Sequence, residues 1–212
     1  MSYGEVRQKV LTVVQKAVAC GLVRLSAGNF SMRTADGHIA ITPSAIKYDV
    51  LTADQIAIVD VNGKHIDGPN KSSSETPMHT AIFRNLPEVG AICHTHSPYA
   101  MTFAVVGQEI PMVNLELLVC GAPIPVAEWA SPGSAKGGEV TVDTFRRRPE
   151  LKVMLLRNHG LVAIGKTLDE AFEYAYDAEV AAQVYYQALQ IGKPIVLTAA
   201  QVQEVREIYG MK

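Results

Sequence analysis

Turn residues between short apolar runs constrain the fold of this 212-residue chain more than any other feature of its sequence. An Asp-Gly pair at 36–37 and an Asn-Gly pair at 62–63 each separate two such runs, and both pairs favour a tight β-hairpin turn. A third hairpin is predicted over 152–165, turning near the Asn-His-Gly of 158–160. Strands joined by hairpins pair antiparallel, so we expect a sheet whose neighbouring strands run mostly in opposite directions.

Helices are predicted between and after these strands. Residues 3–20 carry apolar side chains at helical spacing and are followed by a glycine, which is common just past a helix end. The segment 69–86 is a polar loop that enters a helix, and Ser97 is placed to N-cap another. A capping-box pattern opens a long helix over 167–191, and Thr198 opens a short last helix.

Two further segments complete the predicted organisation. Residues 110–119 alternate in the manner of a strand, and 121–138 is rich in proline and glycine and is expected to be a loop. No linker divides the chain, which predicts one domain over 1–212. Together the elements predict an α/β or α+β domain with helices on the faces of a mixed sheet.

The composition excludes several classes of function. With a formal net charge of −2, the chain has no basic footprint for nucleic acid. It also has no apolar run of membrane-spanning length and no signal-peptide pattern. Cys20, Cys93 and Cys120 are widely spaced in apolar surroundings, so we expect buried free thiols in a reducing compartment. The predicted location is therefore the cytoplasm.

Two histidines, His94 and His96, stand one residue apart at the end of an apolar run. Side chains two apart on a strand project from the same face, so these imidazoles lie side by side while Cys93 points away. This geometry suits two metal ligands, although a solvated strand face also carries such pairs. His159 is a third candidate, but histidine also tolerates the backbone of a turn. The remaining histidines are weaker candidates: His38, His65 and His79.

Glu75 is the fourth candidate ligand. With Ser72 it fits a capping box, in which its carboxylate would only bond the backbone at a helix start. A helix N-terminus also keeps a carboxylate ionised, which suits a ligand of a divalent cation. Three imidazoles with a carboxylate or a water form a Zn²⁺-type ligand set.

Five motifs follow one another along the chain: AGN at 27–29, ITPS at 41–44, SSE at 73–75, HTHSP at 94–98 and NHG at 158–160. In these motifs and their spacing the chain resembles the class II aldolase/adducin family over nearly its whole length. The resemblance implies a three-layer α/β fold whose central sheet, mixed but mainly antiparallel, is flanked by helices. It also implies a homotetramer with active sites at subunit interfaces.

The resemblance assigns roles to the candidate residues. His94, His96 and His159 match the zinc-binding histidines of the family, with Mn²⁺ or Co²⁺ as alternative metals. Glu75 matches a carboxylate that either binds zinc or acts as an acid/base. The pocket for the substrate phosphate matches five residues: Asn29, Thr42, Ser44, Ser73 and Ser74. Without the resemblance, the serine run before Glu75 is an ordinary polar loop with a helix cap.

The chemistry implied by the resemblance is an enediolate held on zinc, with Glu75 moving the proton at the enediolate carbon. Tyr209 matches a second acid/base contributed by an adjacent subunit, or else anchors the last helix. Glu116 is the other candidate for that role, or else a surface carboxylate. The chain departs from the aldolases at Leu115, where they have tyrosine. It departs again at Ala45, where they have glycine and a positive φ would be strained.

The predicted function is a zinc-dependent aldolase that cleaves a ketose 1-phosphate of the fuculose or deoxyribulose type. Its products would be dihydroxyacetone phosphate and a small aldehyde. An enzyme like L-ribulose-5-phosphate 4-epimerase, which uses the same retro-aldol chemistry, is the alternative. A non-catalytic adducin-like module is a third reading, which retention of all four candidate ligands disfavours. The expected partner is a small phosphorylated sugar. We expect no binding to nucleic acid or to a membrane.

Overall fold

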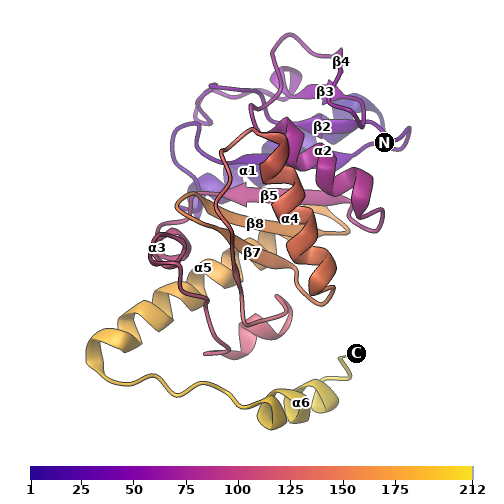
Figure 1. Cartoon of the computed structure of the whole chain (residues 1–212). Helices are drawn as coiled ribbons and strands as arrows, with labels where there is room; N and C mark the ends of the chain where they lie inside the picture. The colour runs from indigo at the N-terminus through magenta and orange to yellow at the C-terminus, as the bar shows by residue number, and fades with distance from the viewer. Residues whose placement is uncertain (212) are drawn as a thin grey trace.

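The structure is a computed structural model, and it describes residues 1–211. Within them an eight-stranded sheet forms the middle layer, and helices cover both of its faces (Figure 1). The strands are β1 (Asn29–Arg33), β2 (Ile39–Ile41), β3 (Ala57–Val59), β4 (His65–Asp67), β5 (Ala91–Thr95), β6 (Val126–Ala127), β7 (Val153–Leu156) and β8 (Gly160–Gly165).

The strands lie in the order β4-β3-β2-β1-β5-β8-β7-β6, and every pair is antiparallel except β6 with β7. The three predicted hairpins are confirmed as β1–β2, β3–β4 and β7–β8. Strand β5 lies between β1 and β8 and so joins the two halves of the sheet. The α/β class and the mixed, mainly antiparallel sheet between helical layers are therefore confirmed.

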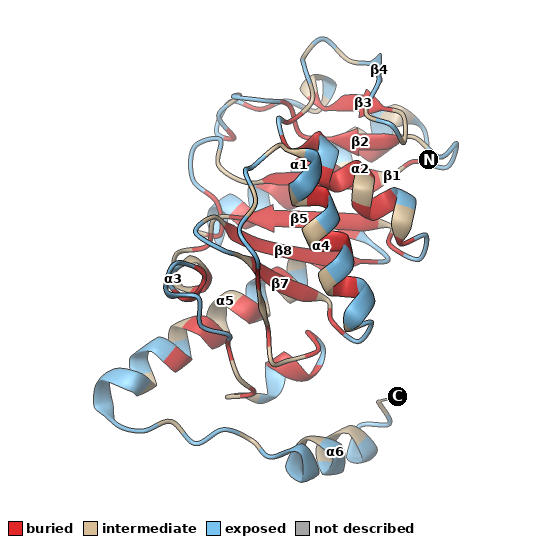
Figure 2. Cartoon of the chain, viewed as in Figure 1, coloured by how far each residue is buried: buried red, intermediate tan, exposed pale blue. Residues whose placement is uncertain are grey.

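The helices divide between the two faces of the sheet (Figures 1 and 2). Helices α1, α3 and α5 pack into the larger hydrophobic core, and α2 and α4 pack into the smaller core on the opposite face. Their bounds are α1 (Tyr3–Ala19), α2 (Thr76–Asn85), α3 (Pro98–Val106), α4 (Ala135–Arg147), α5 (Leu168–Ile191) and α6 (Ala199–Ile208), with 3₁₀ helices η1 (Ala53–Gln55) and η2 (Leu115–Leu118).

The alternation of β1 places polar side chains under α2. Phe30 and Met32 belong to the larger core, on the face covered by α1. Asn29 and Ser31 point to the other face, where both bond to His79 of α2. The interior beneath α2 is therefore partly polar.

Two segments differ from their predicted structure. Residues 110–119 contain η2 in place of an alternating strand, because the adjacent Leu117 and Leu118 are both buried. The predicted loop 121–138 contains β6, and α4 begins inside it. Both errors arise where packing, rather than a local signal, decides the structure.

Glycine at the start of α4 serves packing between helices. A Cβ atom at Gly138 would lie 2.7 Å from the Cβ of Ala81 in α2. The side chain of Ser134 caps this helix by accepting from the backbone N–H of Gly137. Gly138, one of the glycines that indicated a loop, therefore allows α4 to lie close against α2.

The cysteines are not all buried. Cys93 and Cys120 are buried free thiols as expected, whereas Cys20 is exposed. Cys20 is the C-cap residue of α1, past Ala17, the last buried residue of that helix. Among the described residues, no helix has the length and apolar character that a membrane crossing requires.

Helix α6 lies apart from the sheet layers (Figure 1). An extended stretch follows α5 and exposes Ile195 almost completely. The stretch is tied back where the N–H of Leu197 donates to the carbonyl oxygen of Met112 at 2.9 Å. The segment that leads into α6 is therefore attached to the rest of the protein near Met112, and much of the surface of α6 faces solvent.

Candidate metal centre

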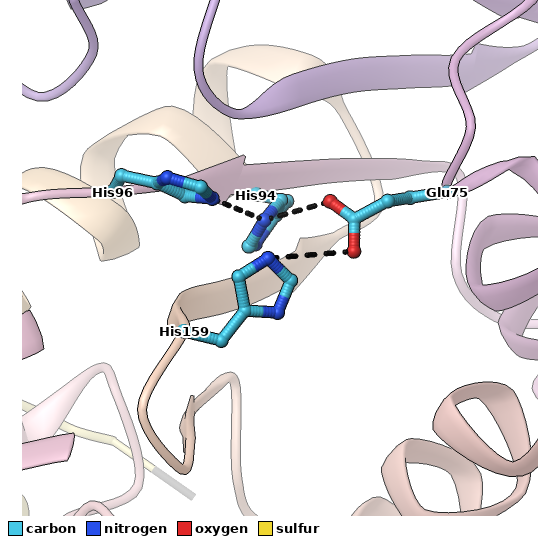
Figure 3. A group of neighbouring side chains, drawn as sticks. All are labelled: Glu75, His94, His96 and His159. Carbon is cyan, nitrogen blue, oxygen red and sulfur yellow. Dashed lines mark hydrogen bonds and ion pairs between the residues drawn. The ribbon is translucent and has the colours of Figure 1, made fainter. Parts of the chain in front are cut away.

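Four side chains from three parts of the chain meet at one end of β5 (Figure 3). Glu75 precedes the first turn of α2, His94 lies in β5, His96 follows that strand, and His159 stands in the turn before β8. Their candidate ligand atoms all lie within 4.8 Å of one another. The structure thus brings together the four residues that the sequence suggested as metal ligands.

Sheet pairing explains this convergence. Strands β5 and β8 are antiparallel, so the start of β8, beside His159, meets the end of β5. The rings of His94 and His96 lie on the same side, with centroids 4.9 Å apart. Cys93 packs into the larger core on the other face of β5, as predicted.

His94 is at the centre of the group. Its Nε2 atom lies 2.9 Å from Oε2 of Glu75 and 3.1 Å from Nε2 of His96. The other oxygen of Glu75, Oε1, lies 3.5 Å from Nε2 of His159. Three imidazole nitrogens and two carboxylate oxygens therefore face one small volume.

The chemistry of this donor set fits a cation. Nδ1 of His94 lies 2.9 Å from the carbonyl oxygen of Leu161, which only accepts, so Nδ1 carries the ring proton. The Nε2 atom of His94 then faces a carboxylate oxygen and a second imidazole nitrogen. Positive charge among these atoms, such as that of a divalent cation, favours their close approach. Backbone carbonyls commonly orient ligand histidines at zinc sites in this way.

Burial and neighbouring charges set the protonation of the group. Burial, followed by the nearby His94, lowers the pKa of His96 and of His159 to about 4. Burial alone would raise the pKa of Glu75, but the His94 and His159 imidazoles and the Asn29 amide hold it below its ordinary range. At neutral pH His96 and His159 are neutral and the carboxylate is ionised, the forms in which these groups bind metals.

A glycine keeps the group close together. A Cβ atom at Gly160 would collide with the carbonyl oxygen of Thr95 and lie 3.1 Å from Cδ2 of His96 and 3.2 Å from Cε1 of His94. Because position 160 carries no side chain, the turn before β8 lies directly against the end of β5.

The predicted capping box of Ser72 and Glu75 is wrong. The carboxylate of Glu75 makes no cap hydrogen bond and faces the histidines instead. The backbone N–H of Glu75 donates to Oγ of Ser73 at 3.2 Å, and Ser72 is paired with Pro43 in an isolated β-bridge. Helix α2 begins at Thr76, three residues later than this capping box requires, which leaves the Glu75 carboxylate available to the site.

Most residues predicted to bind a substrate phosphate lie on two adjoining loops. Backbone hydrogen bonds from Ser73 to Thr42 and from Ser44 to Lys71 hold the loops side by side. The side chains of Thr42 and Ser73 are buried and accept from backbone N–H groups. Ser44 and Ser74 are exposed and therefore accessible to a ligand.

The other parts of the predicted phosphate pocket differ in character. Asn29 is buried at the start of β1, and its amide donates to Oε2 of Glu75 at 2.8 Å. Ala45, which stands where the aldolases have glycine, has a φ of 61°. That backbone conformation is strained for a residue with a Cβ atom, as the sequence comparison anticipated.

The two candidates for a second acid/base lie outside the group of ligands. Glu116 is exposed on η2, so the strand on which it was placed is absent from this segment. Tyr209 is the C-cap residue of α6 and is 69% exposed. Their catalytic roles stay predictions.

Sequence reasoning ranked His79 only as a weaker candidate and missed Ser31, and both residues lie behind Glu75. His79 and Ser31 are fully buried, and with Asn29 they form a chain of hydrogen bonds that ends on the Glu75 carboxylate. One signal was available, because His79 follows Glu75 by about one helical turn and so lies on the same side.

The comparisons with known proteins agree with this geometry. The family model described as the class II aldolase and adducin N-terminal domain matches residues 8–186. A 5-deoxy-D-ribulose 1-phosphate aldolase from Bacillus thuringiensis is 31% identical over 210 residues, 97% of each chain. A 5-methylthioribulose-1-phosphate/5-deoxyribulose-1-phosphate aldolase from Rhodospirillum rubrum is 33% identical over 202 residues, 95% of this chain and 89% of its own.

A solved structure gives the same result. An L-fuculose 1-phosphate aldolase is 28% identical and superimposes with a TM-score of 0.90, covering 97% of this chain and 96% of that one. By sequence and by fold, the chain belongs to the class II aldolase and adducin family.

Proposed function

We propose that this chain is a cytoplasmic, zinc-dependent aldolase that cleaves a ketose 1-phosphate to dihydroxyacetone phosphate and a small aldehyde. The observation that carries the proposal is the convergence of three imidazoles and a carboxylate at one end of β5. The family and the aldolase relatives support a class II lyase acting on a sugar phosphate. The first candidate substrates are 5-deoxyribulose 1-phosphate and fuculose 1-phosphate, after the relatives' names.

The four candidate ligands would have different roles at the metal. His94, His96 and His159 would hold the zinc, and Glu75 would bind it or move off it. The bound cation supplies a Lewis acid for negative charge that develops on the substrate carbonyl oxygen. Glu75 would carry the proton at the carbon that loses its bond to the aldehyde, since it is ionised and adjoins the ligand nitrogens.

The substrate phosphate would bind beside the metal, on the loops that carry Ser44 and Ser74. Both hydroxyls are exposed, and the second loop leads into the N-terminus of α2. A helix N-terminus and hydroxyl donors favour a phosphate dianion. Asn29 would adjoin both the substrate phosphate and the metal-bound part of the substrate, because it also donates to Glu75.

A second acid/base must take the proton from the hydroxyl that becomes the aldehyde. We assign this role to Tyr209 of a neighbouring subunit in a homotetramer, for which its exposure at the end of α6 leaves it accessible. Glu116, exposed on η2, is the competing candidate. Tyr209→Phe should lower kcat by about 100-fold or more with cation affinity unchanged. The same loss in Glu116→Gln instead would transfer the role to Glu116.

A product assay tests the reaction. The zinc-loaded protein is incubated with 5-deoxyribulose 1-phosphate, fuculose 1-phosphate or ribulose 5-phosphate, and the products are followed by NMR. Dihydroxyacetone phosphate together with the matching aldehyde supports the proposal. Inversion at C4 of ribulose 5-phosphate without fragments would overturn it in favour of the 4-epimerase. A protein that neither binds zinc nor turns over any substrate would indicate the adducin-like module.

Glu75→Gln tests the proton step separately. Wild-type protein with dihydroxyacetone phosphate in D₂O should exchange one proton of the hydroxymethyl carbon next to the carbonyl. Glutamine keeps the shape but cannot accept the proton, so exchange should slow by about 100-fold or more. Glu173→Gln, at an exposed position of α5, is the control and should exchange normally. Exchange at the wild-type rate in Glu75→Gln would limit Glu75 to binding the metal.

A further inference from the structure

A chain of hydrogen bonds runs from the interior of the sheet to the metal centre. Oγ of Ser31 lies 2.6 Å from Nδ1 of His79, and Nε2 of His79 bonds Oδ1 of Asn29. The Asn29 amide nitrogen then lies 2.8 Å from Oε2 of Glu75. All four residues are at least nine-tenths buried.

The Glu75 carboxylate, at one end of this series of hydrogen bonds, determines which group donates in each of them. The ionised Glu75 carboxylate only accepts, so the NH₂ group of Asn29 must face it and the amide oxygen must face His79. That oxygen also only accepts, so Nε2 of His79 carries the ring proton. Nδ1 is then an acceptor, and the hydroxyl of Ser31 donates to it. One arrangement of protons satisfies all four side chains.

The surroundings of His79 keep this arrangement in place. Burial lowers its pKa to about 3, against the opposing influence of Glu75 and with a smaller lowering by His94. The ring is therefore neutral at physiological pH. A neutral imidazole has one donor and one acceptor nitrogen, which is what the chain requires on its two sides.

The register of the sheet places this series of hydrogen bonds beside the metal centre. Asn29 of β1 lies directly opposite His94 of β5, and Ser31 lies two residues further along the same face. His79 reaches both from α2, one turn beyond Glu75. The amide nitrogen of Asn29 lies 2.8 Å from Oε2 of Glu75, whereas the other carboxylate oxygen lies 3.5 Å from Nε2 of His159.

We propose that His79 is a positioning residue of the metal centre, which holds the Asn29 amide in one orientation and thereby fixes Oε2 of Glu75 toward the cation. The inference rests on the proposed role of Glu75 as a metal ligand. The competing explanation is that His79 only fills a polar space beneath α2. The two differ in what happens at the metal when the donor to Asn29 is removed and when it is restored.

Cobalt spectroscopy distinguishes them without any substrate. We compare the Co²⁺-loaded wild type with His79→Leu, which removes the donor, and His79→Gln, which offers an amide N–H to Asn29. The control Thr80→Ala disturbs the adjacent buried position of α2, whose hydroxyl bonds only the helix backbone. For His79→Leu we expect an altered visible Co²⁺ spectrum and about 10-fold weaker Co²⁺ binding or more. His79→Gln and Thr80→Ala should both resemble the wild type.

Nitrogen NMR of the unmutated, zinc-loaded protein covers the case in which His79→Leu does not fold. The imidazole of His79 should show a protonated Nε2 and an unprotonated Nδ1 at pH 7. A proton on Nδ1, or a charged ring, would overturn the inference. So would a folded His79→Leu variant with the wild-type cobalt spectrum and affinity.

Failure of the proposed aldolase function would give results different from failure of the inference about His79. Wild-type protein that binds cobalt and responds to His79→Leu, yet releases no dihydroxyacetone phosphate from any ketose 1-phosphate, overturns the aldolase and supports the inference. Active aldolase with an unresponsive cobalt spectrum in His79→Leu gives the opposite result.

Discussion

His65, His79 and His159 have the same side chain in three different surroundings. His65 is exposed on β4 and bonds a neighbouring backbone carbonyl, whereas His79 is enclosed between Ser31 and Asn29. His159 stands in the turn before β8 and faces the other ligands. The glycine after His159 indicated a turn in the sequence, so its place could be predicted. The role of His79 could not, because no local pattern says which strand a helix will cover.

At the same scale, the free energy of unfolding should decrease as the pH falls below about 6.5, because folded His79 resists protonation. Burial lowers its pKa from the ordinary 6.5 to about 3. Between these values the unfolded chain binds a proton that the folded protein does not, so acid favours unfolding and the effect levels off near pH 3. The slope from this residue should approach about 1.4 kcal/mol per pH unit, measured by urea denaturation of metal-free protein.

His79→Gln isolates this contribution, because it removes the titrating ring and keeps a donor for Asn29. His96 and His159 titrate in both proteins, so their effects cancel in the difference between wild type and variant. That difference should change steadily between pH 6 and pH 4. A constant difference over this interval would contradict a neutral, enclosed His79.

At the scale of elements, Gly160→Ala should weaken zinc binding, because the added methyl group would push the turn before β8 away from β5. The methyl group would collide with the carbonyl oxygen of Thr95 and crowd the rings of His94 and His96. We expect the affinity for Zn²⁺ to fall about 10-fold or more, measured by competition with a chromogenic chelator.

Gly192→Ala is the matched control for this substitution. No atom lies within 4 Å of a Cβ atom there, and the φ of Gly192 is 173°, an extended backbone open to any residue. Zinc affinity should therefore stay at the wild-type value. Unchanged affinity in Gly160→Ala as well would refute the close contact of β5 with β8 as a condition for binding.

Helix α3, which follows His96, is held at its start by a carboxylate from α5. Glu179 accepts from the backbone N–H groups of Tyr99 at 3.0 Å and Ala100 at 2.8 Å. Glu179→Ala should lower the free energy of unfolding by about 1–3 kcal/mol, because these half-buried donors lose their partner. Urea denaturation measures the loss, and Glu173→Ala, exposed on α5, should change it by less than about 0.5 kcal/mol. Equal losses in both variants would count against this role.

Elements with a local signal could be predicted, and elements defined by packing could not. The Asn-Gly pair at 62–63 encodes its own hairpin, since Gly63 takes a φ of 87° that few other residues adopt. The glycines that open α4 carry no such signal, because Gly138 is needed only for the approach to Ala81. In the same way, burial of both Leu117 and Leu118 depends on α5, against which η2 packs.

At the scale of the whole molecule, zinc should raise the melting temperature, because its ligands come together only in the folded state. A ligand at about 100 times its Kd adds about 2.7 kcal/mol to the free energy of unfolding. For a chain of this size that corresponds to a rise of roughly 5–10 °C. Differential scanning fluorimetry with added zinc, and then with excess chelator, measures the rise and its reversal.

His96→Ala removes one ligand and serves as the control. Its melting temperature should respond to zinc and to chelator by a fraction of the wild-type shift, since the remaining ligands bind more weakly. A wild-type melting temperature that neither zinc nor chelator changes would rule out the metal centre.

The docking of the C-terminal segment is also a property of the whole molecule. The sequence predicted a helix opening at Thr198, and α6 begins after this N-cap. It gave no indication of the backbone bond from Leu197 to Met112 that attaches the segment. The side chains of Ile191 and Ile195 beside it are almost fully exposed. Contacts such as the bond from Leu197 to Met112 join surfaces distant in sequence, and hydrophobic pattern alone does not specify them.

The position of β5 between β1 and β8 also determines when the site can first exist. During synthesis Glu75, His94 and His96 leave the ribosome well before His159, and β5 has only one of its two neighbours until β8 emerges. A nascent chain therefore offers an incomplete set of ligands with one edge of β5 unpaired. The four candidate ligands can therefore meet only after β8 has been made and has paired with β5, and a product that ends before His159 lacks one of them.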